Sequence, residues 1–447
     1  MRDVVKSYGG DRVTRALLDF LKAEAAGGIV MLIATALALV VANSALAEVY
    51  DAFWHQYAGV SVADWSLKLS LHHWVNDGLM AIFFFLVGLE IKRELLFGEL
   101  ASPQRAALPV IAAAGGAVLP ALLYLAFNAG GSYAQGWGVP MATDIAFAVT
   151  LLALLGSRAP LWLKSFVTAL AIADDIMAVL VIAFFYSGNL DLVALGWAAA
   201  FVAGLAALNL SRVMRPAPYV VLAIGLWYFV LQSGIHATIA GVVAAAFVPA
   251  SLGRLRDEAG KTAETIRDHL DALMPSDVPR EAWRVVDERE ADLEEIAEVA
   301  SRQSAPLYRL EHAIHPWSAF LILPVFAFAN AGVGIALDGL GAALSSPLAL
   351  GVMVGLFVGK QIGITGAAWL AVKSGIGRLP EGGRWSQIWG GAALAGIGFT
   401  MSIFIASLAF TVPEDLAIAK LAILTGSLAS AIAGVVLLRA AGSRDAA

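Results

Sequence analysis

Apolar segments long enough to cross a lipid bilayer recur along most of this chain, and they constrain its fold more than any other feature. A helix needs about 20 apolar residues to span the hydrocarbon of a membrane. Since 60% of the residues are hydrophobic and only 14% are charged, the sequence predicts an all-α integral membrane protein. We expect about twelve transmembrane helices, or eleven because the eighth segment is short and the fourth is interrupted: 25–43, 73–91, 106–128, 138–156, 161–186, 191–210, 217–234, 236–250, 316–336, 347–372, 388–410 and 416–439.

Lysine and arginine residues are distributed so as to place both chain termini in the cytoplasm. With twelve spans, 26 of the 29 Lys and Arg residues lie on the cytoplasmic side, while Lys68 and Lys420 lie outside and Lys360 lies within a span. Membrane proteins concentrate these residues in their short cytoplasmic loops. The sequence therefore predicts a multi-pass protein, in contact with lipid, whose two ends face the cytoplasm.

One charged segment divides the membrane part in two. The predicted organisation is a cytoplasmic N-terminal segment, helices 1–8, a charged cytoplasmic insert, helices 9–12 and a cytoplasmic tail: 1–24, 25–250, 251–310, 311–439 and 440–447. The insert carries fourteen Asp and Glu and nine Lys and Arg residues around an apolar helical stripe. It is interpreted as a solvated helical hairpin or, alternatively, as a regulatory or partner-docking element.

Two adjacent aspartates, Asp174 and Asp175, lie at the centre of an otherwise apolar span, SFVTALAIADDIMAVLVIAFFY. Ionisable groups at that depth are costly and are tolerated mainly when they are paired or line an aqueous path. The two carboxylates would titrate as a coupled pair. Because hard cations prefer oxygen ligands, the same oxygens can hold either protons or Na⁺ or Li⁺. This competition is the minimum requirement of an antiporter.

Two further ionisable residues lie within spans. Asp144 follows Pro140 in GWGVPMATDIAFAVTLLALLG, where a broken helix would expose the positive end of a half-helix. Asp144 is interpreted as electrostatic support for that end, as an ion ligand, or as both. Lys360 is expected to pair with Asp174 or Asp175, and snorkelling to the membrane interface is the alternative. A second interruption is expected at 390–410, where Gly396 and Gly398 precede Thr400 and Ser402.

Several titratable residues are predicted near the span ends. Glu90 and Glu94 share one helix face in GLEIKREL and form either a solvated helix end or an acidic funnel, with Asp77 near the outer mouth. His236 opens the eighth span, and Glu311, His312 and His315 cluster before the ninth. Histidine suits pH sensing, although such residues are more often caps or packing residues.

In these segments the chain resembles the NhaA family of sodium/proton antiporters. The matching stretches are FFFLVGLEIKREL, MATDIAFA, LAIADDIMAV, SGIHATIAGV, HPWSAFLILPVFAFANAG, LFVGKQIGI and GIGFTMSIFIASLAF. They cover nearly all of the membrane part in order. The resemblance implies an inverted-repeat fold in which the fourth and eleventh helices are discontinuous and cross at mid-membrane. It also implies electrogenic, pH-regulated exchange of two external protons for one cytoplasmic Na⁺ or Li⁺ across the bacterial inner membrane, and a homodimer.

The resemblance also implies roles for individual residues. Asp175 resembles the principal cation ligand and proton carrier, and Asp174 resembles its partner, which the family pairs with the lysine matching Lys360. Thr143 and Asp144 match the broken-helix site. Five residues match positions tied to pH response: Glu90, Glu94, His236, Glu311 and His315. The insert and Gln361, which follows Lys360, depart from the family pattern.

Two other functions are weighed against the antiporter. An intramembrane aspartyl protease would also use paired carboxylates, but the GxGD-type loop is absent and a hydrolase would not require Lys360. A sodium-coupled symporter would move an organic solute together with Na⁺. We expect a secondary transporter and not an enzyme, without an organic cofactor or a nucleic-acid partner. The chain has no cysteine, which excludes disulfides, thiolate metal sites and cysteine nucleophiles.

Overall fold

A computed structural model describes residues 26–62, 65–188, 190–250, 305–334, 339–379 and 382–442. Most of the predicted insert, residues 251–304, lies outside the described residues, as do the N-terminal segment 1–25 and the tail 443–447. The described chain is nearly all helical, which confirms the predicted fold class. Its first half contains the helix Ala26–Ala42, α2 (Ala47–Trp54), α3 (Leu71–His73), α4 (Met80–Phe97), α5 (Pro103–Asn128), α6 (Ile145–Leu154), α7 (Leu161–Phe185), α8 (Leu192–Leu210), α9 (Pro216–Gln232) and α10 (Ile239–Phe247).

The second half continues with the helices α13 (Pro306–Trp317), α14 (Leu323–Asn330), α15 (Leu340–Ser345), α16 (Pro347–Val354), α17 (Lys360–Lys373), α18 (Trp385–Ala395), α19 (Phe399–Ala409) and α20 (Pro413–Gly442). Three π-helical turns join helices into longer spans: η1 (Trp74–Leu79), η6 (Ser318–Ile322) and η8 (Gly355–Gly359). The described residues also include three 3₁₀ segments: η2 (Glu99–Ala101), η3 (Ala134–Met141) and η4 (Gly156–Arg158). The ninth predicted span therefore begins at Pro306 instead of near 316.

Eight of the described helices are long and apolar enough to cross a membrane, and two bent pairs raise that number to ten if each counts as one span. The bent pairs are Ala26–Ala42 with α2, at 116°, and α18 with α19, at 45°. The helices α9 and α10 have only 17 and 9 residues. The count of twelve spans thus stays a prediction.

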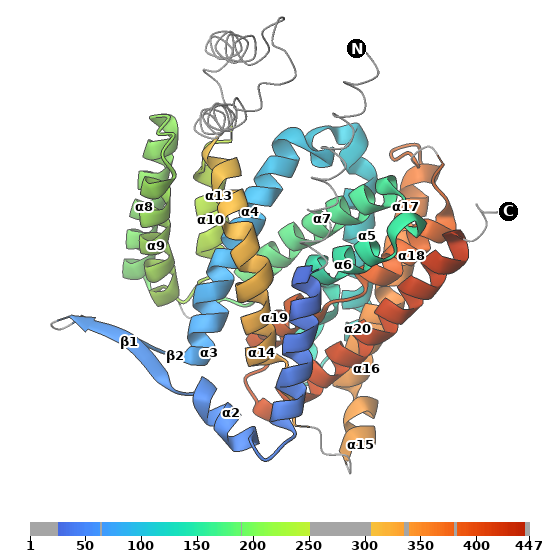
Figure 1. The fold of residues 1–447 in the computed structure, drawn as a ribbon, viewed down its shortest axis with the longest axis horizontal. Helices are drawn as coiled ribbons and strands as arrows, with labels where there is room; N and C mark the ends of the chain where they lie inside the picture. Colours follow the sequence, from blue (N-terminus) through green and yellow to red (C-terminus); the bar gives the residue numbers. More distant parts are fainter. Residues whose placement is uncertain are drawn as a thin grey trace, which may run out of the picture.

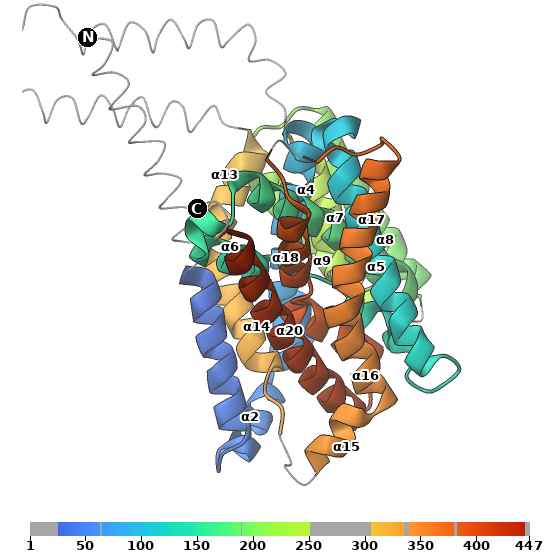
Figure 2. The same ribbon diagram turned by 90° about the vertical axis from the view of Figure 1, so that its right-hand side faces the viewer.

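Two glycines allow α5 and α17 to pack with their backbones in contact. A Cβ placed on Gly363 of α17 would lie 2.2 Å from the carbonyl oxygen of Gly115 on α5, so the two backbones touch. Helices in membranes approach in this way because small residues remove the steric barrier. The side-by-side course of α5, α16 and α17 is visible in Figure 2. This contact fixes the helix that carries Lys360.

The apolar core falls into two main groups. The larger group runs through α5, α7, α18, α19 and α20, and the smaller one joins α8, α9 and α10 to α4 and α13. Figure 1 shows α8 and α9 at one side of the bundle, with α10 between them and α4. Large apolar side chains such as Phe184, Leu210 and Leu428 point outward and are exposed, as expected where lipid replaces water.

A β-hairpin, which the sequence analysis did not predict, follows α2. Its strands β1 (Tyr57–Val62) and β2 (Trp65–Ser70) pair antiparallel, with Tyr57 opposite Ser70 and Val62 opposite Trp65. The hairpin extends away from the helices in Figure 1. Its alternating pattern of apolar and polar residues is typical of a strand with two different faces.

Candidate ion-binding site

The aspartate pair lies midway along α7, deep in the bundle. Asp174 is 1% exposed and Asp175 is 3% exposed. Successive residues of an α-helix point about 100° apart, so the two carboxylates meet different surroundings. Asp174 Oδ2 lies 2.7 Å from Lys360 Nζ, and Lys360 is fully buried. The predicted ion pair is therefore present, and the snorkelling alternative for Lys360 is wrong.

Asp175 has different surroundings from its neighbour. Within the described part of the chain, no hydrogen bond or ion pair reaches its carboxylate. Asp174 Oδ1, in contrast, is a fully buried atom without a hydrogen-bond partner. Buried polar atoms are normally satisfied, because an unpaired one costs several kcal/mol. Carboxylate oxygens in this position are suited to hold a proton or a cation that enters the site.

Both predicted helix interruptions are present. Between η3 and α6 the backbone is extended at Ala142 and Asp144, and α18 ends at Ala395 before α19 begins at Phe399. The two breaks lie against each other. The N–H of Asp144 donates to the carbonyl of Ile397 at 2.6 Å, and Ser402 Oγ donates to the carbonyl of Val139 at 2.8 Å. The crossing of two discontinuous helices that the resemblance implied is confirmed.

Asp144 caps two half-helices at once. Its Oδ1 accepts the N–H of Phe147 at 3.1 Å, in the first turn of α6. Its Oδ2 accepts both the N–H of Thr400, at 3.0 Å, and the Thr400 hydroxyl, in the first turn of α19. The N-terminus of a helix carries partial positive charge from its unpaired N–H groups. Both carboxylate oxygens of Asp144 are thus engaged in compensating helix ends, which favours support over cation binding.

Lys360 connects its ion pair with Asp174 to the carbonyl end of α18. Its Nζ donates to Thr143 Oγ1 at 2.9 Å, and this hydroxyl donates to the carbonyl of Ala395 at 2.8 Å. Ala395 is the last residue of α18, where the carbonyl groups carry partial negative charge. Positively charged Lys360 therefore lies near the partly negative end of α18. Negatively charged Asp144 lies beside the partly positive ends of α6 and α19.

The residue after Lys360, Gln361, bridges two helices. Its amide donates to the carbonyl of Phe357 at 2.8 Å, and its Oε1 accepts the indole N–H of Trp389 on α18 at 2.8 Å. The π-helical turn η8 ends at Gly359, directly before Lys360. Such turns are frequent at functional sites because they redirect the following side chains.

A sequence profile of the Na⁺/H⁺ antiporter 1 family matches residues 18–438 of the chain. The chain belongs to the Na⁺/H⁺ antiporter 1 family. It is 47% identical to the Na⁺/H⁺ antiporter NhaA of Oleidesulfovibrio alaskensis, over 96% of this chain and 94% of that protein. Its identity to the NhaA of Acidithiobacillus ferrooxidans is 48%, with coverage of 94% and 96%. For the NhaA of Rhodospirillum rubrum it is 44%, with coverage of 95% and 97%.

Membership of the antiporter family, together with the apolar spans, makes this chain an integral bacterial membrane protein. Its relatives are named as transporters and not as enzymes, so the predicted transporter class is confirmed and the protease interpretation is wrong. The family supports exchange of Na⁺ for H⁺, so Na⁺ and H⁺ are the transported ions.

Two of the antiporter's predicted pH-response residues lie where α4 meets α13. Glu311 Oε1 is 3.3 Å from Arg93 Nη1, and His315 lies one helical turn further along α13. On α4, Glu94 Oε1 accepts the N–H of Glu99 at 2.6 Å, and Glu90 lies one turn before Glu94. The structure thus brings Glu311 to α4, whereas Glu94 caps the short helix η2.

His236 lies apart from these residues. It is in the link between α9 and α10, where its Nδ1 is 3.9 Å from Asp77 Oδ1 on η1. Its ring packs edge-on against Phe404 of α19, with the ring centres 5.4 Å apart. Asp77 and Glu90 belong to the same continuous span, Leu71–Phe97, but lie about four turns apart along it. The structure therefore does not group His236 with Glu90, Glu94, Glu311 and His315.

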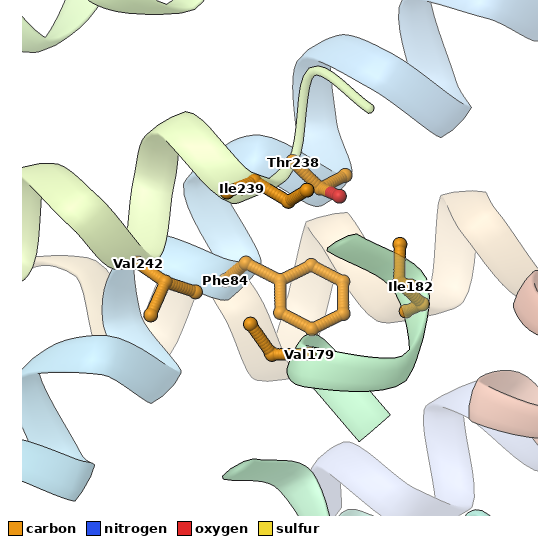
Figure 3. Close-up of a pocket in the computed structure, with 6 residues that line it drawn as sticks. All are labelled: Phe84, Val179, Ile182, Thr238, Ile239 and Val242. Atoms are coloured by element: carbon orange, nitrogen blue, oxygen red, sulfur yellow. The ribbon is translucent and has the colours of Figure 1, made fainter. Parts of the chain in front are cut away.

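A small apolar pocket lies between α7, α4 and α10 just beyond the aspartate pair. Figure 3 shows the side chains that line it, which come from these helices and the link before α10: Phe84, Val179, Ile182, Thr238, Ile239 and Val242. Val179 lies one turn after Asp175 on α7. Since Thr238 is the one polar side chain among them, the pocket itself offers too few oxygen ligands for a cation.

Two hydroxyl residues at the crossing were not assigned roles from the sequence. Thr400 was expected only to permit an unwound segment, yet it binds Asp144 through two donors. Ser427 of α20 was not singled out at all, yet its Oγ accepts two backbone N–H groups at the break between α18 and α19. Hydroxyl residues are common in membrane helices, so neither one is distinctive in the sequence.

Proposed function

We propose that this antiporter exports cytoplasmic Na⁺ or Li⁺ in exchange for external protons, with Asp175 as the principal cation ligand and proton carrier. The observation that carries the proposal is the buried Asp175 carboxylate, which lacks a partner within the described chain, beside an Asp174 that is paired with Lys360. Asp174 supplies a second carboxylate through its unpaired Oδ1. Protons leave the aspartates towards the cytoplasm as Na⁺ binds, and they return from outside as Na⁺ is released.

The crossing of the two broken helices supports this exchange electrostatically. Asp144 compensates the positive ends of α6 and α19, and Lys360 with Thr143 compensates the carbonyl end of α18. The ends of α6, α18 and α19 at the crossing are therefore compensated by side chains of opposite charge or by a hydroxyl. In the proposed cycle one group of helices rocks against the other around this fixed site.

The proposed exchange moves two protons for each Na⁺ and is therefore electrogenic. Two carboxylates take part, so a cycle in which one Na⁺ displaces two protons transfers one net charge. A charge that crosses the membrane gains about 2.3 kcal/mol per 100 mV. An inside-negative membrane potential would thus drive proton entry and export Na⁺ against its gradient.

The cellular setting is also part of the proposal. The distribution of lysine and arginine supports a location in the inner membrane with both termini in the cytoplasm. The protein works in contact with membrane lipid and without an organic cofactor. It forms a homodimer, as the family resemblance implies. The residues at the junction of α4 and α13, with Arg93 and Glu311 in contact, support regulation by cytoplasmic pH.

Fluorescence dequenching in proteoliposomes tests this function. The vesicles carry an imposed acid-inside pH gradient, and Na⁺, Li⁺ or K⁺ is then added at several pH values between about 6.5 and 9. We expect dequenching with Na⁺ and Li⁺ but not with K⁺, and no response from Asp175→Asn. An imposed potential should change the rate if the exchange is electrogenic. A flux of Na⁺ that requires an added organic solute would instead support the symporter.

A further inference from the structure

The break between α18 and α19 leaves backbone donors exposed at membrane depth. The first N–H groups of a helix have no partner within that helix. In α19, Gly398 is the residue before the first turn and has no side chain with which to cap it. The N–H of Thr400 is bound by Asp144, and the donors that remain at this helix end include the N–H groups of Gly398 and Phe399.

A serine on the neighbouring helix satisfies both donors. Ser427 Oγ, on α20, accepts the N–H of Gly398 at 3.2 Å and the N–H of Phe399 at 3.2 Å. Ser427 is buried, and no other residue of α20 has a side-chain hydrogen bond to this break within the described chain. Ser427 thus acts in trans as the cap that the sequence of α19 lacks.

The segment 397–400 is held from two sides. On one side, Asp144 donates its N–H to Ile397 and accepts two hydrogen bonds from Thr400. On the other side, Ser427 holds Gly398 and Phe399, the two residues between them. Neither anchor is in α18 or α19, so these two contacts together set the position of the α19 N-terminus.

We propose that Ser427 is a positioning residue for the ion site, which fixes the positive end of α19 against Asp144. This inference rests on the proposed function, because it assigns Ser427 a part in cation affinity. Without the hydroxyl, the two N–H groups at the positive end of α19 would be unpaired. They would have to find another acceptor close to the carboxylates of the site. Both oxygens of Asp144, which accepts hydrogen bonds from Thr400 in the same turn, are already engaged, so the segment would move and Na⁺ would bind more weakly.

A second serine on α20 provides the matched control. Ser430 lies one turn beyond Ser427, is fully buried and faces the same break, since a Cβ on Gly396 would lie 2.7 Å from Ser430 Oγ. Within the described chain, Ser430 Oγ has no hydrogen-bond partner. Ser430→Ala therefore removes a hydroxyl of the same size from the same helix without removing a cap.

The experiment compares wild type, Ser427→Ala, Ser430→Ala and Ser427→Thr in proteoliposomes at one pH, with the initial rate of exchange measured against Na⁺ concentration. We expect Ser427→Ala to raise the KM for Na⁺ about three- to tenfold, on the scale of one or two lost hydrogen bonds. Ser430→Ala should stay within about twofold of wild type, and Ser427→Thr, which keeps the acceptor oxygen, should restore the KM.

A KM that is unchanged in Ser427→Ala, or raised equally in Ser430→Ala, would overturn the inference. A purely structural role would reduce the amount of folded protein but leave the KM of the remaining molecules as in wild type. If Ser427→Ala does not fold, Ser427→Cys keeps the bulk with a weaker acceptor and should still raise the KM. Wild type without any Na⁺-driven proton movement would refute the proposed function instead.

Discussion

The carboxylate of Asp144 accepts hydrogen bonds from both the backbone N–H and the hydroxyl of Thr400, a residue 256 positions further along the chain. This contact joins the first turns of two half-helices that enter the membrane in different halves of the sequence. It places one negative charge between two positive helix ends. These hydrogen bonds at the buried crossing do not involve Asp175, the residue proposed to bind the transported ions.

Replacement of Asp144 by asparagine should destabilise the crossing. One carboxylate oxygen becomes an amide group, which cannot accept the N–H of Phe147 or Thr400, and the charge between the two helix ends is lost. We expect a loss of about 1–2 kcal/mol of stability, seen as a lower midpoint of thermal unfolding in detergent. In a matched comparison, Thr400→Val should lower the thermal midpoint more in wild type than in the Asp144→Asn background. Equal effects in both backgrounds would show that the contact is not energetically coupled.

The Lys360–Asp174 pair should behave as a buried ion pair. Lys360→Met leaves the Asp174 carboxylate unpaired, and the loss of one buried partner typically costs about 3–5 kcal/mol. Lys360→Met combined with Asp174→Asn removes both charges and should recover much of that loss. The yield of folded protein and its thermal midpoint measure the effect. A double variant less stable than Lys360→Met alone would contradict the pairing.

The glycine contact between α5 and α17 should be intolerant of even one methyl group. Gly363→Ala would place a Cβ 2.2 Å from the carbonyl oxygen of Gly115, so the helices must separate, at a cost of about 1–3 kcal/mol. Gly366→Ala on the same helix is the control, because a Cβ there has nothing within 4 Å. It should be neutral or slightly stabilising. Thermal midpoints that fall equally in both variants would contradict the close contact.

The ion pair between Arg93 and Glu311 should contribute to stability in a pH-dependent manner. The Glu311 side chain is 9% exposed and the Arg93 side chain is 38% exposed. Arg93→Gln removes the partner of an ionised Glu311, so it should cost about 1 kcal/mol at pH ~8. The difference from wild type should shrink as the pH falls and the Glu311 carboxyl becomes protonated, since a protonated carboxyl no longer needs the cation.

The double variant Arg93→Gln with Glu311→Gln is the control for this pair. It lacks the titrating carboxyl, so its difference in thermal midpoint from Glu311→Gln alone should not depend on pH. A pH-dependent difference between these two variants would show that another group causes the effect.

The main charges of the site could be predicted from the sequence because ionisable residues inside apolar spans are rare. Asp144, Asp174, Asp175 and Lys360 each stand alone or paired in such a span, and the structure brings them to one crossing. The two helix interruptions were also predictable, from Pro140 in one span and from Gly396 and Gly398 in the other. In each case, a residue type that is costly or unusual in a membrane helix marked the position.

Other parts of the site could not be predicted, for physical reasons. Adjacent carboxylates are equivalent in a sequence, so the residues alone did not decide which one pairs with Lys360; only the family resemblance indicated Asp174. Thr400 and Ser427 act through contacts between helices distant in sequence, and their hydroxyls have no distinctive local pattern. The hairpin of β1 and β2 was missed because its short alternation lies between two spans.

Proton release by the purified protein on addition of Na⁺ tests most directly whether cation and protons compete for Asp175. The protein is held in detergent in a weakly buffered solution, and a pH indicator follows the protons released by Na⁺, with K⁺ as the control. Wild type should release protons with Na⁺ only, and Asp175→Asn should release none above the K⁺ background. Release from Asp175→Asn equal to that of wild type would contradict the assignment, because the competition would then occur at another group.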